Sequence, residues 1–216
     1  MKKNAMCSLL AVVCLGVVGA GKVVRVTDLG AVGDGKTLDT AAFEAALEVA
    51  RSTPGTRIVA PSGGRYLIAP INLTSHTTLH IEANATIVGV KDRSAWPLIP
   101  GAPSYGQGRD HPGPRYTSLL HGEHVEDVAV VGEGETSVLD GNGEYWWDAV
   151  HDLNYTRGHL LEFMYSRRVR VFDVAMVDSP FWNNHFFDTE DVHVRGVRIS
   201  AKFNSPNTDG WDPDSA

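Results

Sequence analysis

Short runs of apolar residues, many of them alternating with polar ones, dominate the chain from residue 57 onward. Such runs predict strands, because successive side chains of a strand point to opposite faces. The first clear examples are Ile58–Ala60, Tyr66–Ile68, Leu79–Ile81 and Val128–Val131, and a similar short run occurs at Val23–Val26. We therefore expect an all-β protein.

A helical spacing of apolar residues occurs once, before most of these runs. The predicted stripe consists of Phe43, Leu47 and Ala50, which fits a helix of about three turns over 39–51. Asp39 is the expected N-cap, with Leu38 and Phe43 packed across it. Pro54-Gly55 provides the stop signal.

Two segments near the end of the chain carry apolar residues at identical spacing. The first set is Val169, Val171, Val174 and Met176, and the second, 23 residues later, is Val192, Val194, Val197 and Ile199. A period of about 20–30 residues between similar strands is typical of a solenoid. The leucine-rich repeat shares this period, but its regular Leu/Asn consensus is missing here.

The repeat therefore predicts a parallel β-helix, whose turns need only inward-facing apolar ladders. The helix at 39–51 would cap its first turn, and the segments 97–114 and 142–157 would project as loops. Loops of this kind form binding grooves on the side of a solenoid. The alternative is an ordinary β-sandwich in which two strands match by chance.

The first twenty residues have the pattern of a cleaved signal peptide. Lys2 and Lys3 precede an apolar run that is shorter than the roughly 20 residues of a membrane-spanning helix, and small residues follow at 18–20. We expect residues 1–20 to be a signal peptide and residues 21–216 to form a partial parallel β-helix domain. Both cysteines lie in the signal, so the remainder has no disulfides and depends on its core.

Charge and glycosylation signals agree with this secretory route. The 216 residues carry 19 basic and 26 acidic side chains, and removal of the signal leaves a net charge of −9. Such a charge argues against a nucleic-acid partner. Asn72, Asn84 and Asn154 each begin an Asn-x-Thr sequon, so we expect glycosylation at these three positions. The expected location is secreted, either extracellular or in a cell wall, with no membrane contact after cleavage.

A cluster of carboxylate and amide side chains lies in the last twelve residues. Taken alone, it is typical of an acidic turn. A 23-residue turn of the solenoid would instead place Asn207 beside Asn184 and put Asp209 within a strand or at its edge. The acidic residues would then lie on a stacked strand.

Four segments resemble, in the same order, sequences of the polygalacturonases, glycoside hydrolase family 28. They are Gly30-Ala31-Val32-Gly33-Asp34-Gly35 with Thr37, Asp39-Thr40 and Phe43; Leu139-Asp140-Gly141-Asn142-Gly143 with Trp146-Trp147; Ser179-Pro180-Phe181-Trp182 with His185; and Asn207-Thr208-Asp209-Gly210. The resemblance covers roughly residues 24–216. The extension Asp212-Pro213-Asp214-Ser215 resembles a plant and bacterial branch that includes exo-acting enzymes, whereas Trp211 and Ala216 depart from the family's usual residues.

The resemblance implies a right-handed parallel β-helix and inverting hydrolysis of α-1,4-galacturonosyl bonds in pectin, without a cofactor or metal. By the motif match, Asp209 is one of two water-activating bases, Asn207 orients groups near it, and His185 contacts substrate. Inverting enzymes also need a carboxylic acid about 6.5–9.5 Å from the bases. The family's Asp-Asp pair, its Gly-His-Gly histidine and its Arg/Lys pair have no counterpart here. The resemblance therefore implies that residues 21–216 are a partial glycosidase domain. We expect a β-helix truncated at its C-terminus, inactive alone, monomeric, with pectin or polygalacturonate as partner.

Two other functions fit the same residues. One is a non-catalytic β-helix fragment that at most binds carbohydrate. The other is a Ca²⁺-dependent lyase, in which Asp209, Asp212 and Asp214 would hold the ion and an arginine would act as base. Among weaker signals, His121-Gly122-Glu123-His124 is expected to be a solvated turn, and Trp146, Trp147 and Trp182 could pack in the core or stack on sugars.

Overall fold

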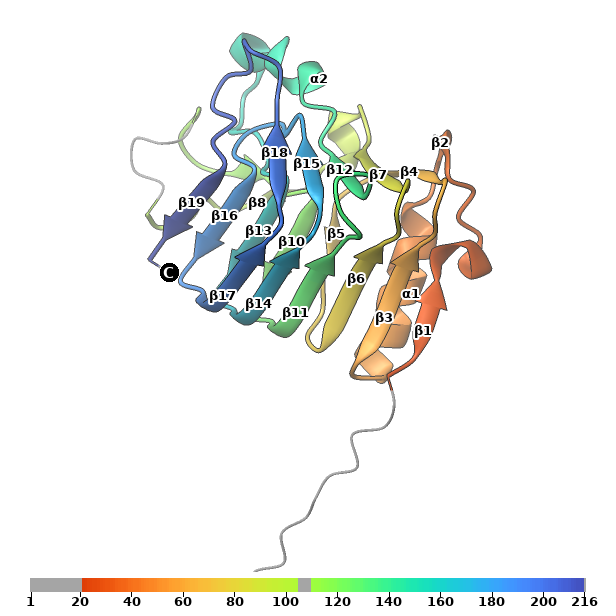
Figure 1. Cartoon of the computed structure of the whole chain (residues 1–216). Coiled ribbons are helices and arrows are strands. Elements are labelled where there is room, and N and C mark those ends of the chain that lie inside the picture. Colours follow the sequence, from red (N-terminus) through yellow and green to blue (C-terminus); the bar gives the residue numbers. More distant parts are fainter. Residues whose placement is uncertain (1–20, 105–109, 216) are drawn as a thin grey trace, which may run out of the picture.

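The computed structural model describes residues 21–104 and 110–215, and in them the chain winds into a column of parallel strands (Figure 1). The predicted signal peptide, residues 1–20, lies outside the described residues. Three sheets run along the column, and each turn of the chain contributes strands to them in succession. Neighbouring strands within these three sheets pair in parallel, which confirms the predicted parallel β-helix.

The elements are as follows. The first sheet contains β1 (Val23–Arg25), β3 (Thr56–Ala60), β6 (Thr77–Ile81), β11 (Glu126–Val131), β14 (Arg167–Phe172) and β17 (Glu190–Arg195). The second contains β5 (Ile71–Asn72), β10 (Leu120–Glu123), β13 (Leu161–Met164), β16 (Asn184–Phe187) and β19 (Trp211–Asp214). The third contains β2 (Asp34–Leu38), β4 (Arg65–Ile68), β7 (Thr86–Gly89), β12 (Val138–Asp140), β15 (Ala175–Val177) and β18 (Arg198–Ser200). The helices are η1 (Val26–Leu29), α1 (Thr40–Ser52), η2 (Arg93–Ala95), α2 (Glu144–Trp147) and η3 (Val150–Asp152).

The 23-residue period predicted from the sequence is present in the first and third sheets. Val169 pairs with Val192 and Val171 with Val194 between β14 and β17. Met176 pairs with Ile199 between β15 and β18. Because side chains alternate, this register stacks apolar residues of successive turns over one another inside the column.

An apolar ladder fills the first sheet's inner face. We call it the valine ladder; it consists of Val128, Val130, Val169, Val171, Val192 and Val194. Its first four members are fully buried, whereas Val194 is 42% exposed because β17 is the last strand of its sheet. Burial of such side chains is the main stabilising term of a solenoid that has no disulfides.

Helix α1 covers the first turn, as predicted, and packs against η1 and β3 (Figure 1). Phe43, Leu47 and Ala50 are buried in the core. The expected cap is wrong in its details. Asp39 occupies the N-cap position but makes no capping bond; its carboxylate accepts the backbone N–H groups of Val32 and Gly33 at 2.6 and 3.1 Å. Leu38 is 51% exposed, so it does not form the predicted staple with buried Phe43.

The two predicted projecting segments contain some regular structure. Strand β8 (Leu98–Ile99) pairs antiparallel with β9 (Arg115–Tyr116) and so closes the first of them at its base. The second holds α2 and η3. Trp146 in α2 is fully buried, and its ring contacts Trp96 and Tyr116 edge-on with centroids 5.0 Å away. This tryptophan is therefore a core residue that anchors the segment.

The last turn does not keep the predicted period in the second sheet. Asn184 pairs with Trp211 and His185 with Asp212, an offset of 27 residues. The predicted pairing of Asn184 with Asn207 is therefore wrong, because the connection between β18 and β19 holds four more residues than one 23-residue turn allows. Among the described residues, no helix is both long and apolar enough to cross a membrane.

Candidate functional site

The segment that carries Asn207 and Asp209 forms a turn directly before β19. Both residues are exposed, and Asn207 adopts a positive φ of 55°. Asparagine tolerates this left-handed conformation better than most residues. The turn therefore presents the Asp209 carboxylate to solvent at the entrance to a strand.

Two buried asparagines of the preceding turn hold this segment by its backbone. Asn183 donates its backbone N–H to the Asp209 carbonyl at 2.8 Å and its side-chain amide to the carbonyls of Thr208 and Asp209 at 3.1 Å. Asn184 donates its side-chain amide to the Gly210 carbonyl at 2.9 Å. These bonds fix the backbone that carries the exposed Asp209 side chain.

Arg157 provides a second anchor for the same turn. Its guanidinium is fully buried, pairs with Asp110 at 2.8 Å and lies over the Phe181 ring at 4.7 Å. It also donates to the Pro206 carbonyl at 3.0 Å and to Asn207 Oδ1 at 3.2 Å. The fork geometry of the arginine guanidinium suits donation to several acceptors at once. The side chain of Asn207, one of the predicted substrate residues, is thus held by Arg157.

Three aspartates follow one another through this end of the second sheet. Asp209 is exposed, whereas Asp212 and Asp214 in β19 are partly buried. Burial raises the pKa of Asp212 to about 6, and the charge of Asp209 adds to this effect against a smaller opposing influence of His185. Asp214 accepts a hydrogen bond from the hydroxyl of Ser104 and lies 3.6 Å from His185 Nε2. The site therefore contains one carboxyl group, that of Asp212, whose pKa is raised by its surroundings.

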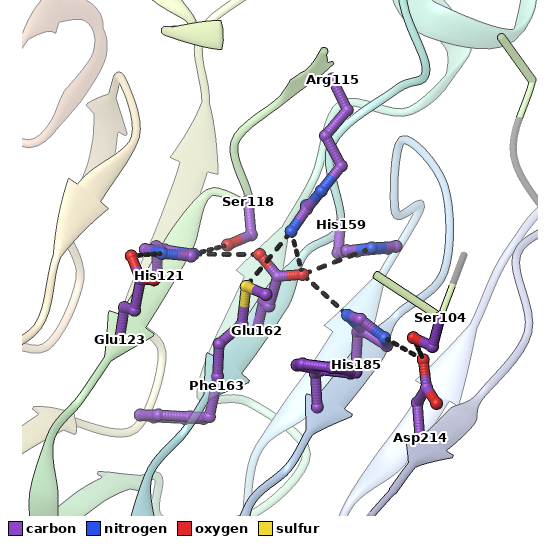
Figure 2. Close-up of polar contacts among 12 residues, drawn as sticks. Ser104, Arg115, Ser118, His121, Glu123, His159, Glu162, Phe163, His185 and Asp214 are labelled. Carbon is purple, nitrogen blue, oxygen red and sulfur yellow. Dashed lines mark hydrogen bonds and ion pairs between the residues drawn. The ribbon is translucent and has the colours of Figure 1, made fainter. Parts of the chain in front are cut away.

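Below β19 the second sheet holds a buried group of charged and ionisable side chains, which we call the Glu162 cluster. It consists of Arg115, His121, His159, Glu162 and His185, all at most 5% exposed (Figure 2). Glu162 Oε1 accepts from Arg115 Nη2 at 2.7 Å and lies 2.7 Å from His185 Nδ1. Its Oε2 lies 3.0 Å from His121 Nδ1. One carboxylate thus joins strands β10, β13 and β16 and the short strand β9.

The charge state of this cluster follows from its contacts. Burial raises the pKa of Glu162, but the Arg115 guanidinium and the hydrogen bonds of His121 and His185 outweigh it and hold the pKa well below its usual range. Burial holds the pKa of His159 well below its usual value, against the attraction of Glu162. Glu162 is therefore ionised at neutral pH, and His159 is neutral.

His159, Glu162 and His185 also offer ligand atoms within 4.8 Å of one another, a spacing that a metal ion could use. The chemistry of the set does not favour a cation. Arg115 already donates to Glu162 Oε1, the oxygen that both histidines face, and its positive charge would repel a metal ion there. A hydrogen bond already joins Glu162 to His185, and an ion pair joins Glu162 to Arg115.

The Glu162 cluster was not predicted from the sequence, although the 23-residue period contained the signal. Glu162 lies 23 residues before His185, so the repeat places the two side by side, and the structure pairs them in register. The segment His121–His124 was expected to be a solvated turn. That expectation is wrong for His121, which is buried in β10, because its imidazole faces Glu162 rather than water.

The other predicted site residues fall at separate places. His185 is fully buried, so its contact with a substrate stays a prediction. Asn72, Asn84 and Asn154 are all exposed, and their glycosylation also stays a prediction. A surface pocket of about 640 Å³ adjoins Asn207, and Trp147, His151, Lys202 and Phe203 contribute to its wall. The predicted loop 142–157 therefore does form one side of a hollow beside the terminal turn.

Comparisons with known proteins give a consistent result. The family model described as glycosyl hydrolases family 28 matches residues 51–216. A probable polygalacturonase of Vitis vinifera is 41% identical over 193 residues, which are 87% of this chain and 39% of the relative. An exopolygalacturonase of Zea mays is 26% identical, over 89% of this chain and 43% of the relative. The chain spans about two fifths of the length of the curated relatives it matches.

Solved structures share the architecture. The exopolygalacturonase from Thermotoga maritima superposes with a TM-score of 0.74 at 27% identity, over 89% of this chain and 49% of that one. A polygalacturonase from Erwinia carotovora superposes with a TM-score of 0.66 at 20% identity, over 90% of this chain and 51% of that one. The likeness at 20% identity supports the fold.

Proposed function

The chain belongs to glycosyl hydrolases family 28, and on this basis we propose that the protein hydrolyses the α-1,4-galacturonosyl linkages of polygalacturonate with inversion. The observation that supports this most directly is the turn before β19. It presents the Asp209 carboxylate to solvent while Asn183 holds its backbone and buried Arg157 holds the neighbouring Asn207. An exposed carboxylate on an anchored backbone suits a base, which must come within hydrogen-bond reach of the water that it deprotonates.

In this mechanism Asp209 is one of the two carboxylates that hold and deprotonate the attacking water. Inversion needs the acid on the opposite side of the scissile bond, about 6.5–9.5 Å away, so that a water fits between base and sugar. Asn207 orients groups beside Asp209. We further propose that His185 contributes to the substrate site, through the partly buried β19 carboxylates that it faces.

The remaining expectations accompany this proposal. The protein would be secreted to the extracellular space or a cell wall, with residues 1–20 acting as a cleaved signal. Asn72, Asn84 and Asn154 are exposed and sterically open to glycosylation, which supports that route. We propose a monomer whose partner is the pectic polymer.

The genomic sequence past codon 216 gives the first test. One further turn after Asp209 is about 23 residues, as between Val169 and Val192, so an in-frame Asp-Asp pair is expected near that distance. A longer product with that pair should release reducing ends from polygalacturonate. Asp209→Asn should abolish this release, whereas the matched control Asp191→Asn, an exposed aspartate on the first sheet, should leave it unchanged.

The same assay distinguishes the alternatives. The 216-residue chain alone should give no turnover, because it has no counterpart for the acid or the second base. Appreciable activity of this chain that Asp209→Asn abolishes would show that the assignment of the missing groups is wrong. Unsaturated products that absorb in the ultraviolet and disappear with EDTA would instead indicate a calcium-dependent lyase. Binding of the polymer without any cleavage by the longer product would indicate a carbohydrate-binding protein.

A further inference from the structure

The surface pocket of about 640 Å³ lies between the segment of α2 and η3 and the connection from β18 to β19. Both segments are at the top of the column in Figure 1. The volume is within the range of about 300–1,000 Å³ that is usual for small-molecule sites. Asn207, two residues before Asp209, belongs to the wall. The pocket therefore adjoins the turn that carries the candidate base.

Both sides of the pocket are fixed to the column. On the α2 side, the half-buried indole of Trp147 donates its Nε1–H to the Ser179 carbonyl at 3.0 Å. On the other side, the guanidinium of buried Arg157 donates to Asn207 Oδ1 at 3.2 Å. These contacts hold the two walls in place without a ligand, as is usual for sites that bind small molecules.

The apolar part of the wall faces solvent. The Phe203 side chain is fully exposed, and Trp147, Val150 and Pro206 line the same hollow. Single exposed apolar side chains are common on proteins, but four around one pocket form a surface that gains from being covered. The C–H face of a sugar ring and the methyl group of an ester are groups that cover such a surface.

The charges of the wall disfavour an anionic ligand. Lys202 is the one lysine or arginine among the lining residues, and its Nζ lies 2.5 Å from Glu144 Oε1. Asp148 adds a second carboxylate to the wall. Beyond the wall, Asp178 acts on Lys202 and Lys91 acts on Glu144, one charge of each sign. Two carboxylates against one ammonium leave an excess of negative charge, which repels a further carboxylate.

We propose that this pocket is a subsite that binds a methyl-esterified galacturonate unit of the polymer in preference to a free, ionised one. The choice of pectin as ligand rests on the proposed function, and the subsite adds which of its units the protein accepts beside Asp209. Phe203 and Trp147 pack on the sugar ring and the ester methyl, whereas Asp148 repels a free carboxylate. His151 and Asn204, also in the wall, offer hydrogen bonds to hydroxyl groups.

The test measures binding, so it uses the 216-residue chain. The ¹⁵N-labelled protein is titrated with trigalacturonate or with its methyl ester, each up to about 10 mM, which nearly saturates a site with a Kd of about 1 mM. The pH is about 7.5, above the usual histidine pKa of about 6.5, so that histidines are largely neutral. We expect the ester to shift the Trp147 indole signal and the backbone amides of Lys202, Phe203 and Asn204.

Salt separates charge from shape as the cause of the preference. At low salt the ester should bind about two- to fivefold more tightly than the acid, the size of an interaction between exposed charges. At about 1 M salt, where the screening length is about 3 Å, the difference should disappear. A preference that salt does not change would contradict the role of Asp148.

Two variants with matched controls sharpen the test. In Asp148→Asn the acid and the ester should bind about equally, whereas Asp191→Asn, on the exposed first sheet, should keep the preference. Phe203→Ala should weaken binding of the ester about three- to tenfold, because the apolar surface that the ligand covers is lost. Leu38→Ala removes an equally accessible apolar side chain in β2, far along the chain from the pocket, and should leave binding unchanged.

Two results would overturn the subsite. One is an acid that binds as tightly as the ester at low salt, and the other is an ester that shifts no signal of the pocket at about 10 mM. If the acid shifts the amides around Asp209 and neither oligomer shifts those of the pocket, the subsite fails while the proposed function stands. The proposed function is decided separately, by the activity of the longer product.

Discussion

The valine ladder and the Glu162 cluster occupy the same column but are stabilised in opposite ways. The ladder stacks like on like, Val128 on Val169 and Val169 on Val192, and gains from every apolar side chain removed from water. The Glu162 cluster places one carboxylate among an arginine and three histidines, and depends on each charge having its partner. Stacking of identical apolar side chains is enough to stabilise the first sheet. The second sheet, which carries the candidate site, depends instead on specific pairs of charged side chains.

The largest effect should come from breaking the charge balance of the Glu162 cluster. Arg115→Met leaves the buried Glu162 carboxylate without its guanidinium, which should cost about 3–5 kcal/mol in the free energy of unfolding. Urea unfolding of the purified chain measures this. The double variant Arg115→Met/Glu162→Leu should recover much of the loss, since a well-packed apolar pair avoids the desolvation of both charges. A single variant that loses less than about 1 kcal/mol would contradict the comparison.

Truncation in the apolar part of the column should rank next. Leu139 in β12 is fully buried and pairs with Ile87 and Met176 on either side. Leu139→Ala should therefore cost about 2–5 kcal/mol, set by the cavity it leaves. The control Val194→Ala, on the exposed last strand, should change stability by less than about 0.5 kcal/mol. Equal losses at the two positions would show that the open end of the ladder is as well packed as its middle.

Loss of the arginine fork beneath the terminal turn should have an intermediate effect. Arg157→Lys keeps the charge but cannot contact Asp110, the Pro206 carbonyl and Asn207 together. We expect a loss of about 1.5–3 kcal/mol, the usual size for hydrogen bonds to a charged group. Amide chemical shifts should change mainly at 206–210, next to Asp209. Shifts spread evenly over the column would mean that Arg157 stabilises the fold generally rather than this turn.

The smallest effect concerns Asp212 and depends on pH. Its pKa is raised to about 6 in the folded chain, above the unfolded value of about 3.9. Its contribution to stability is therefore fully present below about pH 3.9 and is lost as the pH rises through about 6. Asp212→Asn should unfold at a slightly higher temperature than the parent chain above pH 6, with the difference closing toward pH 4. A difference that does not change with pH would rule out this titration.

The sequence predicted the parts of the molecule that repeat. The spacing of Val169 and Val171 against Val192 and Val194 predicted strands, sheet and register correctly, because an inward ladder imposes its period on the residues themselves. The apolar stripe of helix α1 was also predicted correctly. Its cap was not, since the Asp39 carboxylate is used by the backbone of a preceding loop, a tertiary contact that no local pattern reveals.

The candidate site was only partly predictable. Asp209 and Asn207 were predicted from a motif, but their register was predicted wrongly. The connection to β19 is four residues longer than the repeat allows, so Trp211 rather than Asn207 lies opposite Asn184. Glu162 was not predicted as a site residue because a single acidic residue in an apolar strand does not by itself indicate a function. The 23-residue offset to His185 would have revealed the pair, had the period been applied to polar positions as well as to valines.

The ionised state of buried Glu162 is the claim on which this comparison depends, and its ¹³C carboxyl signal tests it most directly. In the labelled chain we predict that the signal keeps its ionised position as the pH falls from 7 through about 4.3, the usual value for glutamate, until the chain itself unfolds. The stability that Glu162 contributes is present above that value and is lost as the pH falls further. A Glu162 carboxyl that titrates at or above about 4.3 in the folded chain would contradict the account.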